Sequence, residues 1–266
     1  MRAGHLGIAA AILVLLAGGG AAAEQFDYLR MTQPSSLDRN SFTAAYNLEV
    51  QRGMLTVDKG TGGGGTGGGG GLGGRNDYQG VSHRLYAWYA PLKWLAVGVE
   101  QSVKQADVDS FKYGVLYPEV RFRLPWLREH HLTPSVFTGS RIRVNARRPS
   151  TMVTGVGLER RHGRFGVLGE VAFETSLAED NRENGLRYEA GGNVQLVGPV
   201  VVGLEAWGAA VWQEGAPFQH DFHVGPTLKV RLHRFWVGAN VGAGIKERPN
   251  KTFYDYGCIG QVGFAL

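Results

Sequence analysis

The sequence predicts an all-β fold, a transmembrane antiparallel up-and-down β-barrel of twelve strands. Three observations support this prediction. Apolar and polar residues alternate along twelve stretches, charged residues keep to one side of nearly every stretch, and aromatic residues gather near the ends of stretches. Successive side chains of a strand point to opposite faces, so such alternation gives each strand one apolar and one polar face. A membrane barrel needs this arrangement, with lipid outside and a polar lumen inside.

The first stretch shows the alternation clearly. Residues 41–51 place Phe42 and Leu48 on one face and Asn47 and Glu49 on the other. Eleven similar stretches follow, and most are close to the length of about 9–11 residues that a tilted membrane strand needs. The predicted strands cover residues 41–51, 79–90, 94–104, 111–124, 132–144, 151–161, 165–174, 186–196, 200–211, 221–230, 235–243 and 254–266.

The seventh stretch, FGVLGEVAFE, shows what the two faces carry. Its apolar residues fall on odd positions and its two carboxylates on even positions. In a barrel, the odd positions face lipid and the even positions face the lumen. The predicted lipid-facing residues are Phe165, Val167, Val171 and Phe173, and the predicted lumen-facing residues are Glu170 and Glu174.

The connections between stretches also fit a barrel. Those that follow even-numbered stretches are mostly short, whereas those that follow odd-numbered ones include the predicted external loop 53–78 and the polar segment 245–253. Twelve of the 41 glycines lie in residues 60–74, which predicts a flexible low-complexity loop and not a phosphate-binding loop. A soluble β-sandwich has similar periodicity, so it stays an alternative that partition into the soluble fraction would reveal.

Aromatic residues near the ends of stretches favour the membrane alternative. Aromatic side chains gather in girdles at the two interfaces of a membrane barrel. We therefore expect an interfacial position for Trp88, Tyr89, Trp94, Trp126, Phe235 and Trp236.

The N-terminal residues predict export. Arg2 precedes an apolar run at 6–17, and small residues at 21–23 precede Glu24, which is the pattern of a cleaved signal peptide over residues 1–23. Cleavage removes Arg2 and lowers the formal net charge from +5 to +4, a small excess that does not point to nucleic acid as a partner. The single cysteine, Cys258, has no partner for an intrachain disulfide.

The last stretch carries a resemblance to a known class. In GQVGFAL, apolar and small residues alternate at Gly260, Val262, Phe264 and Leu266. This segment resembles the terminal strand of bacterial outer-membrane β-barrels. The resemblance implies residues 24–39 as a periplasmic N-terminal segment, residues 40–266 as the barrel, and a location in the Gram-negative outer membrane. It also implies contact with membrane lipid and lipopolysaccharide, and with the barrel-assembly machinery through the C-terminal strand.

The polar faces predict a charged lumen. Acidic and basic side chains share the inward register of most strands, which suits a narrow passive pore for small polar solutes or ions. The alternative is a lattice of charges that braces a closed structural barrel. The predicted pore-lining residues are Glu100, Glu119, Arg121, Glu170, Glu174, Arg187, Glu205 and Lys229.

Four arginines cluster around the predicted loop between the fifth and sixth strands. Arg141, Arg143, Arg147 and Arg148 would attract the phosphates of lipopolysaccharide or an anionic solute. The alternative is an ordinary solvated loop, with Arg141 and Arg143 directed inward from the fifth strand.

A lipid hydrolase is the rival class of function. Its candidate groups are His83, His220 and His223, with Ser82 or Ser102 as nucleophile and Asp221 as the third group. These residues form no recognisable local motif, so we expect no enzymatic activity. Three consecutive residues, 129–131, cannot converge on one ion in an extended chain, so we expect no metal site and no cofactor.

Overall fold

A computed structural model describes residues 39–58, 79–107, 110–124, 132–143, 150–177, 183–213, 218–248 and 251–266. These residues form twelve strands: β1 Ser41–Asp58, β2 Gln79–Leu92, β3 Leu95–Asp107, β4 Ser110–Arg123, β5 Leu132–Arg143, β6 Thr151–His162, β7 Phe165–Ser176, β8 Glu183–Gln195, β9 Val200–Gln213, β10 Gln219–Leu232, β11 Phe235–Arg248 and β12 Lys251–Ala265. Among the described residues there is no helix long and apolar enough to cross a membrane.

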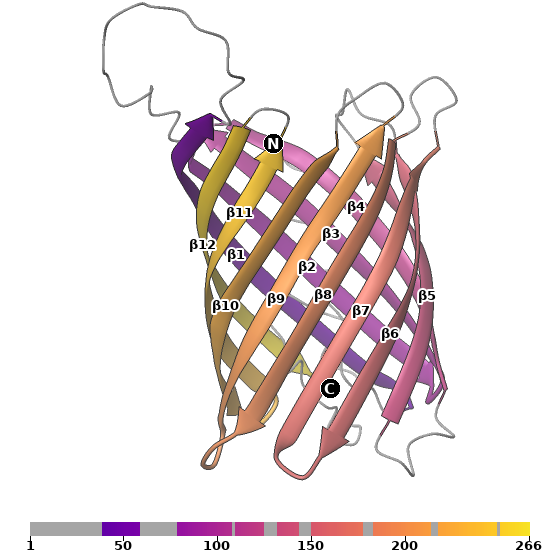
Figure 1. The fold of residues 1–266 in the computed structure, drawn as a ribbon. Helices are drawn as coiled ribbons and strands as arrows, with labels where there is room; N and C mark the ends of the chain where they lie inside the picture. Colours follow the sequence, from indigo (N-terminus) through magenta and orange to yellow (C-terminus); the bar gives the residue numbers. More distant parts are fainter. Residues whose placement is uncertain are drawn as a thin grey trace, which may run out of the picture.

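The strands close into one barrel (Figure 1). Each strand pairs antiparallel with its neighbours in sequence, and β1 pairs with β12 to complete the ring. Closure leaves no unpaired edge, which is the condition for strands to cross hydrocarbon. The predicted twelve-stranded antiparallel barrel is therefore confirmed.

The two ends of the barrel differ in their connections. One end, the turn end, has tight connections such as 163–164 and 233–234. At this end Phe42 and Leu266 also exchange backbone hydrogen bonds of 2.9 and 2.8 Å. Gly163 and Gly198 have positive φ values of 58° and 55° in two of these turns, a conformation that glycine adopts without steric cost. The opposite end, the loop end, carries the long connection between β1 and β2.

The barrel has an apolar outer face and a polar inner face. Along β6 the side chains alternate without interruption between buried and exposed from Thr151 to Arg160. Phe165 and Val171 are 65% and 45% exposed, whereas Glu170 is buried, so the predicted faces of β7 are confirmed. Twelve residues of β6 rise about 40 Å, or about 30 Å when tilted by about 40°, which matches the hydrocarbon layer. The outer face therefore suits lipid.

Two predictions about strand bounds are wrong. β1 continues to Asp58, so the connection to β2 begins at residue 59 and not at 53. Residues 245–253 are mostly strand, because β11 extends to Arg248 and β12 begins at Lys251. Both extensions have one cause, since the first residues of β12 pair with the added part of β1 on one side and with the added part of β11 on the other. The signal peptide, nearly all of segment 24–39 and the glycine-rich run lie outside the described residues.

Two predicted interfacial aromatics are also misplaced. Trp88 and Trp236 are 3% and 0% exposed and lie on the inner face, not in a lipid-facing girdle. Tyr89, Trp94 and Phe235 are exposed near the turn end, as expected. Parity along the strand distinguishes the inward tryptophans from the outward aromatics, because Trp88 shares the parity of Arg84 and Tyr86 on β2.

Candidate functional site

The candidate site is the inner wall of the barrel. Residues paired across an antiparallel sheet share a face, so the alternation and the register together define which side chains point inward. All eight predicted pore-lining residues lie on this inner face: Glu100, Glu119, Arg121, Glu170, Glu174, Arg187, Glu205 and Lys229. Whether they line an open pore stays a prediction.

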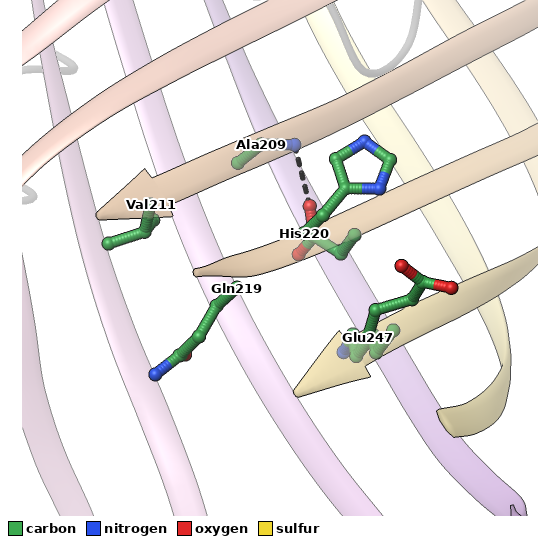
Figure 2. Close-up of a pocket in the computed structure, with 7 residues that line it drawn as sticks. Ala209, Val211, Gln219, His220 and Glu247 are labelled. Carbon is green, nitrogen blue, oxygen red and sulfur yellow. Dashed lines mark hydrogen bonds between the residues drawn. The ribbon is translucent and has the colours of Figure 1, made fainter. Parts of the chain in front are cut away.

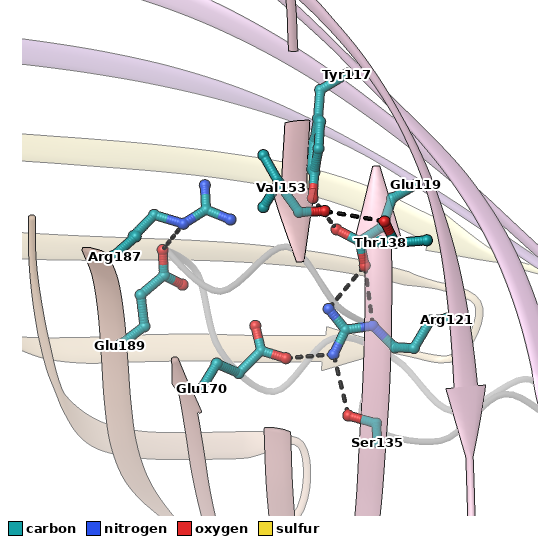
Figure 3. A network of polar contacts seen from close by, with 9 residues as sticks. All are labelled: Tyr117, Glu119, Arg121, Ser135, Thr138, Val153, Glu170, Arg187 and Glu189. Carbon is teal, nitrogen blue, oxygen red and sulfur yellow. Dashed lines mark hydrogen bonds and ion pairs between the residues drawn. The ribbon is translucent and has the colours of Figure 1, made fainter. Parts of the chain in front are cut away.

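A cluster of charged side chains on β4 to β7 lies on the inner wall, nearer the turn end than the loop end (Figure 3). Arg121 donates from Nε and Nη2 to Oε1 of Glu119, at 3.0 and 2.8 Å. Its Nη1 donates to Ser135 Oγ at 3.3 Å and also to Glu170 Oε1 on β7. Tyr117 donates its hydroxyl proton to Glu119 Oε2 at 2.7 Å. One guanidinium thus joins three strands, β4, β5 and β7.

The cluster is held by packing as well as by charge. The Arg121 guanidinium lies 4.1 Å from the centre of the Phe137 ring, and both side chains are 1% exposed. The Phe137 ring in turn covers Gly155 on β6, where a Cβ would overlap the ring. Burial of this kind strengthens the ion pairs and makes an unpaired member costly.

The same pairing of a ring with a glycine recurs around the inner wall. Trp88 covers Gly98, His223 covers Gly244, and Trp236 covers Gly263. In each pair the glycine is the direct cross-strand partner of the ring residue. A side chain lies flat over a partner that lacks Cβ, as in the aromatic rescue of strand glycines. These glycines keep large rings against the wall.

A second cluster lies on β9 to β11. Glu205 accepts a hydrogen bond of 3.0 Å from the Thr227 hydroxyl, and Asn240 Nδ2 lies 3.0 Å from the same hydroxyl oxygen. Lys229 is 0% exposed, and its Nζ lies 4.8 Å from the centre of the Trp236 ring. The side-chain nitrogen of Lys229 therefore contacts an aromatic face in a buried position.

On β5, β7 and β8, the ion pairs of the inner wall near the loop end are more exposed. Arg141 lies 3.2 Å from Glu174, and Arg187 lies 3.9 Å from Glu174 and 3.8 Å from Glu189. These side chains are 18–24% exposed, against 1–9% for the members of the Arg121 cluster. Solvent thus reaches these ion pairs of β5, β7 and β8.

A small pocket opens at the loop end between β9 and β11 (Figure 2). Its volume is about 150 Å³, and Asp221, Lys246 and Glu247 are among the residues that line it. Asp221 Oδ1 accepts a 2.6 Å hydrogen bond from the backbone N–H of Ala209, and Lys246 Nζ lies 2.6 Å from Asp255. The pocket is a charged recess in the rim of the lumen.

The predicted arginine patch divides. Arg141 and Arg143 are part of β5 and lie on its inward register, as the alternative prediction allowed. Arg147 and Arg148 fall outside the described residues. Arg141 lies 5.3 Å from the centre of the Tyr117 ring, so it belongs to the lumen wall.

The candidate hydrolase residues have separate partners. His83 and His220 face outward, where their rings are 2.6 Å from the hydroxyls of Tyr46 and Tyr188. Ser82 points inward to Glu49, and His223 lies 3.3 Å from Asp255. In the described part of the chain, no group of His, Cys, Asp and Glu side chains could hold a metal ion.

The most important site residues that the sequence analysis missed are Trp88, Phe137 and Trp236. Their parity with inward charged residues was the available signal, because Phe137 shares the register of Arg141 and Trp236 is opposed to the outward Phe235 and Val237. The clustering of aromatics near strand ends pointed to the wrong face for the two tryptophans.

Comparison with known proteins supports the fold. No protein-family model matches the sequence, and no curated protein is detectably similar to it. Among solved structures, the COG4313 outer membrane channel from Pseudomonas putida F1 is similar at 7% identity and a TM-score of 0.64, over 90% of this chain and 100% of the other. The outer membrane channel DcaP of Acinetobacter baumannii has 8% identity and a TM-score of 0.43, over 85% and 98% of the two chains.

A third similar structure is the translocator domain of the autotransporter NalP from Neisseria meningitidis. It has 9% identity and a TM-score of 0.40, over 98% of this chain and 95% of the other. The first comparison shows that the fold is that of bacterial outer-membrane β-barrels, as the C-terminal strand predicted.

Proposed function

We propose that this protein is an outer-membrane channel, a narrow passive pore for small polar solutes or ions. The apolar outer face and the charged inner face support this function, because a membrane pore needs both. The similar structure from Pseudomonas putida F1 is itself described as an outer membrane channel. The turn end then faces the periplasm and the loop end faces the exterior, following the usual distribution of short turns and long loops.

The way in which charges pair on the inner wall is the observation that carries the proposal. Glu119 with Arg121, Glu159 with Arg161 and Arg187 with Glu189 are pairs separated by two residues on one strand. Pairs along a strand, like rings laid on glycines, keep bulky groups close to the wall, while Arg121 also pairs with Glu170 three strands away and Arg141 with Glu174 two strands away. This arrangement favours a polar passage down the barrel axis.

A structural barrel with a blocked lumen is the second candidate. The buried state of Arg121, Glu205 and Lys229 favours it, because solvent barely reaches their side chains. Single-channel conductance of the refolded mature chain, after heat-modifiable migration has confirmed folding, separates the two candidates. Discrete openings support the pore, and a folded but silent barrel supports the blocked lumen.

Ion selectivity gives a sharper test of the pore. Glu170 and Glu205 are buried carboxylates on the inner wall, so Glu170→Gln combined with Glu205→Gln removes two carboxylates from the predicted passage. We expect the ion preference to shift toward anions, measured as the reversal potential in planar bilayers under a salt gradient. Glu170→Asp combined with Glu205→Asp, which keeps both negative charges at the same two positions, is the matched control. Unchanged reversal potentials in the double variant would contradict this assignment.

A further inference from the structure

An apolar groove crosses the outer face of the barrel from β6 to β10. Its floor is a row of small residues, Gly169, Ala190 and Ala206, which are direct cross-strand neighbours on β7, β8 and β9. Leu158 pairs with one end of this row and Val224 with the other. Val171, Tyr188 and Phe222 stand along one side, and the groove has a volume of about 490 Å³.

Two arginines lie on the turn-end side of this groove. Arg160 is exposed on the outward register of β6, two residues beyond Leu158 toward the turn. Arg164 is exposed in the following turn, and its Nη1 donates a 3.3 Å hydrogen bond to the Leu196 carbonyl. Among the residues that the structure describes, Arg160 has no acidic partner. Both arginines therefore present positive charge at the rim of the barrel.

The residues around the two arginines place them at the membrane interface. Phe165, on the outward face between them, is 65% exposed, and Val197, in the β8–β9 turn, is 80% exposed. Exposed aromatic and aliphatic residues at the ends of strands are typical of the boundary between hydrocarbon and headgroups. The groove then lies deeper, at the level of the acyl chains.

We propose that this face is a binding site for an anionic phospholipid of the periplasmic leaflet. Its phosphate binds between Arg160 and Arg164, and one acyl chain lies over Gly169 and Ala190 in the groove. Arginine guanidinium groups bind phosphate through charge-assisted hydrogen bonds, and the small residues provide the depth for a hydrocarbon chain. The proposal requires the membrane orientation given above but does not depend on whether the lumen conducts.

Charge favours a lipid over a second copy of the chain in this groove. Two copies related by a two-fold axis along the membrane normal would bring the same patch of each copy together. Arg160 and Arg164 of one copy would then approach the same arginines of the other, which is unfavourable for like charges. An anionic headgroup is attracted by the same pair.

Native mass spectrometry of the refolded, full mature chain tests the proposal. The probes are phosphatidylglycerol and phosphatidylcholine with identical acyl chains, added to the delipidated protein in detergent. We expect preferential retention of phosphatidylglycerol and a loss of this retention by about tenfold or more in Arg160→Gln with Arg164→Gln. The matched control is Lys93→Gln with Arg234→Gln, which removes two exposed positive charges from other turns at the same end.

The groove is tested by filling it. Ala190→Phe should weaken retention of phosphatidylglycerol, whereas Ala239→Phe, at an exposed outward position of β11, should not. Heat-modifiable migration shows that each variant is folded. Equal retention of the two lipids, or equal effects of the two arginine pairs, would overturn the proposal. A dimer that Ala190→Phe abolishes, with lipid retention unchanged, would instead identify the groove as an interface between copies.

Discussion

Two groups of ion pairs on the inner wall, one around Arg141 and Glu174 and one around Arg121 and Glu119, have the same chemistry in different surroundings. Near the loop end, the side chains of Arg141 and Glu174 are 24% and 18% exposed. Near the turn end, those of Arg121 and Glu119 are 1% and 2% exposed. A pair that solvent reaches contributes little to stability, whereas removal of one member of a buried pair leaves an uncompensated charge. The two pairs have the same chemistry and differ in burial. We therefore expect the buried pair to stabilise the fold and the exposed pair to contribute little to stability.

Loss of the buried guanidinium should have the largest effect. Arg121→Ala leaves Glu119 and Glu170 without their common cation, so we expect the free energy of unfolding to fall by about 3–5 kcal/mol. Arg141→Ala, the matched change in an exposed pair, should cost about 1 kcal/mol or less. Denaturant titration in lipid vesicles, followed by tryptophan fluorescence, measures both. Similar losses of unfolding free energy in the two variants would contradict the distinction between the buried and the exposed ion pairs.

A glycine comparison within β12 tests the rings that pack on the inner wall near the turn end. Gly263 lies beneath the Trp236 ring, where an added Cβ would overlap it, so Gly263→Ala should cost about 1–3 kcal/mol through overpacking. Gly260 faces outward with open space around it, so Gly260→Ala should change stability by about 0.5 kcal/mol or less. The same titration compares the two variants. If Gly263→Ala is as mild as Gly260→Ala, the ring is not held against the wall.

The smallest expected effect on stability comes from the exposed ion pairs of Glu174. Glu174→Gln removes the carboxylate shared by Arg141 and Arg187, and we expect a loss of about 1 kcal/mol or less. This loss should disappear in about 1 M salt, where the screening length is about 3 Å. The Arg121→Ala effect should persist at the same salt concentration, because its cluster is buried. A salt-independent loss of stability in Glu174→Gln would show that salt does not screen the ion pairs of Glu174.

Sequence alternation predicted the faces of the strands well. Glu170 and Phe173 lie where their parity placed them, because a strand in a barrel has only two faces and water and lipid demand opposite ones. The bounds of β1 were harder to predict, because its extension to Asp58 depends on pairing with Lys251 at the far end of the chain. At 245–253, polar composition suggested a loop where β1 was available as a partner for the first residues of β12.

The two tryptophans show where a local pattern fails. An aromatic near a strand end fits a membrane girdle, but the parity of Trp236 places it inside, where its partner Gly263 leaves room for the ring. The sequence predicted which charged residues point inward. It did not predict which of them contact one another. Arg121 reaches Glu170 across β5 and β6, a contact that only the curvature of the closed sheet creates.

The sequence by itself determined the class of fold, the number of strands and the chemistry of each face, because these follow from a two-residue period repeated twelve times. Tertiary structure alone decided which charges are buried, which rings rest on glycines, and where small residues from three strands align into a groove. These features depend on register and closure, which bring together residues far apart in the chain. No local window of sequence contains that information.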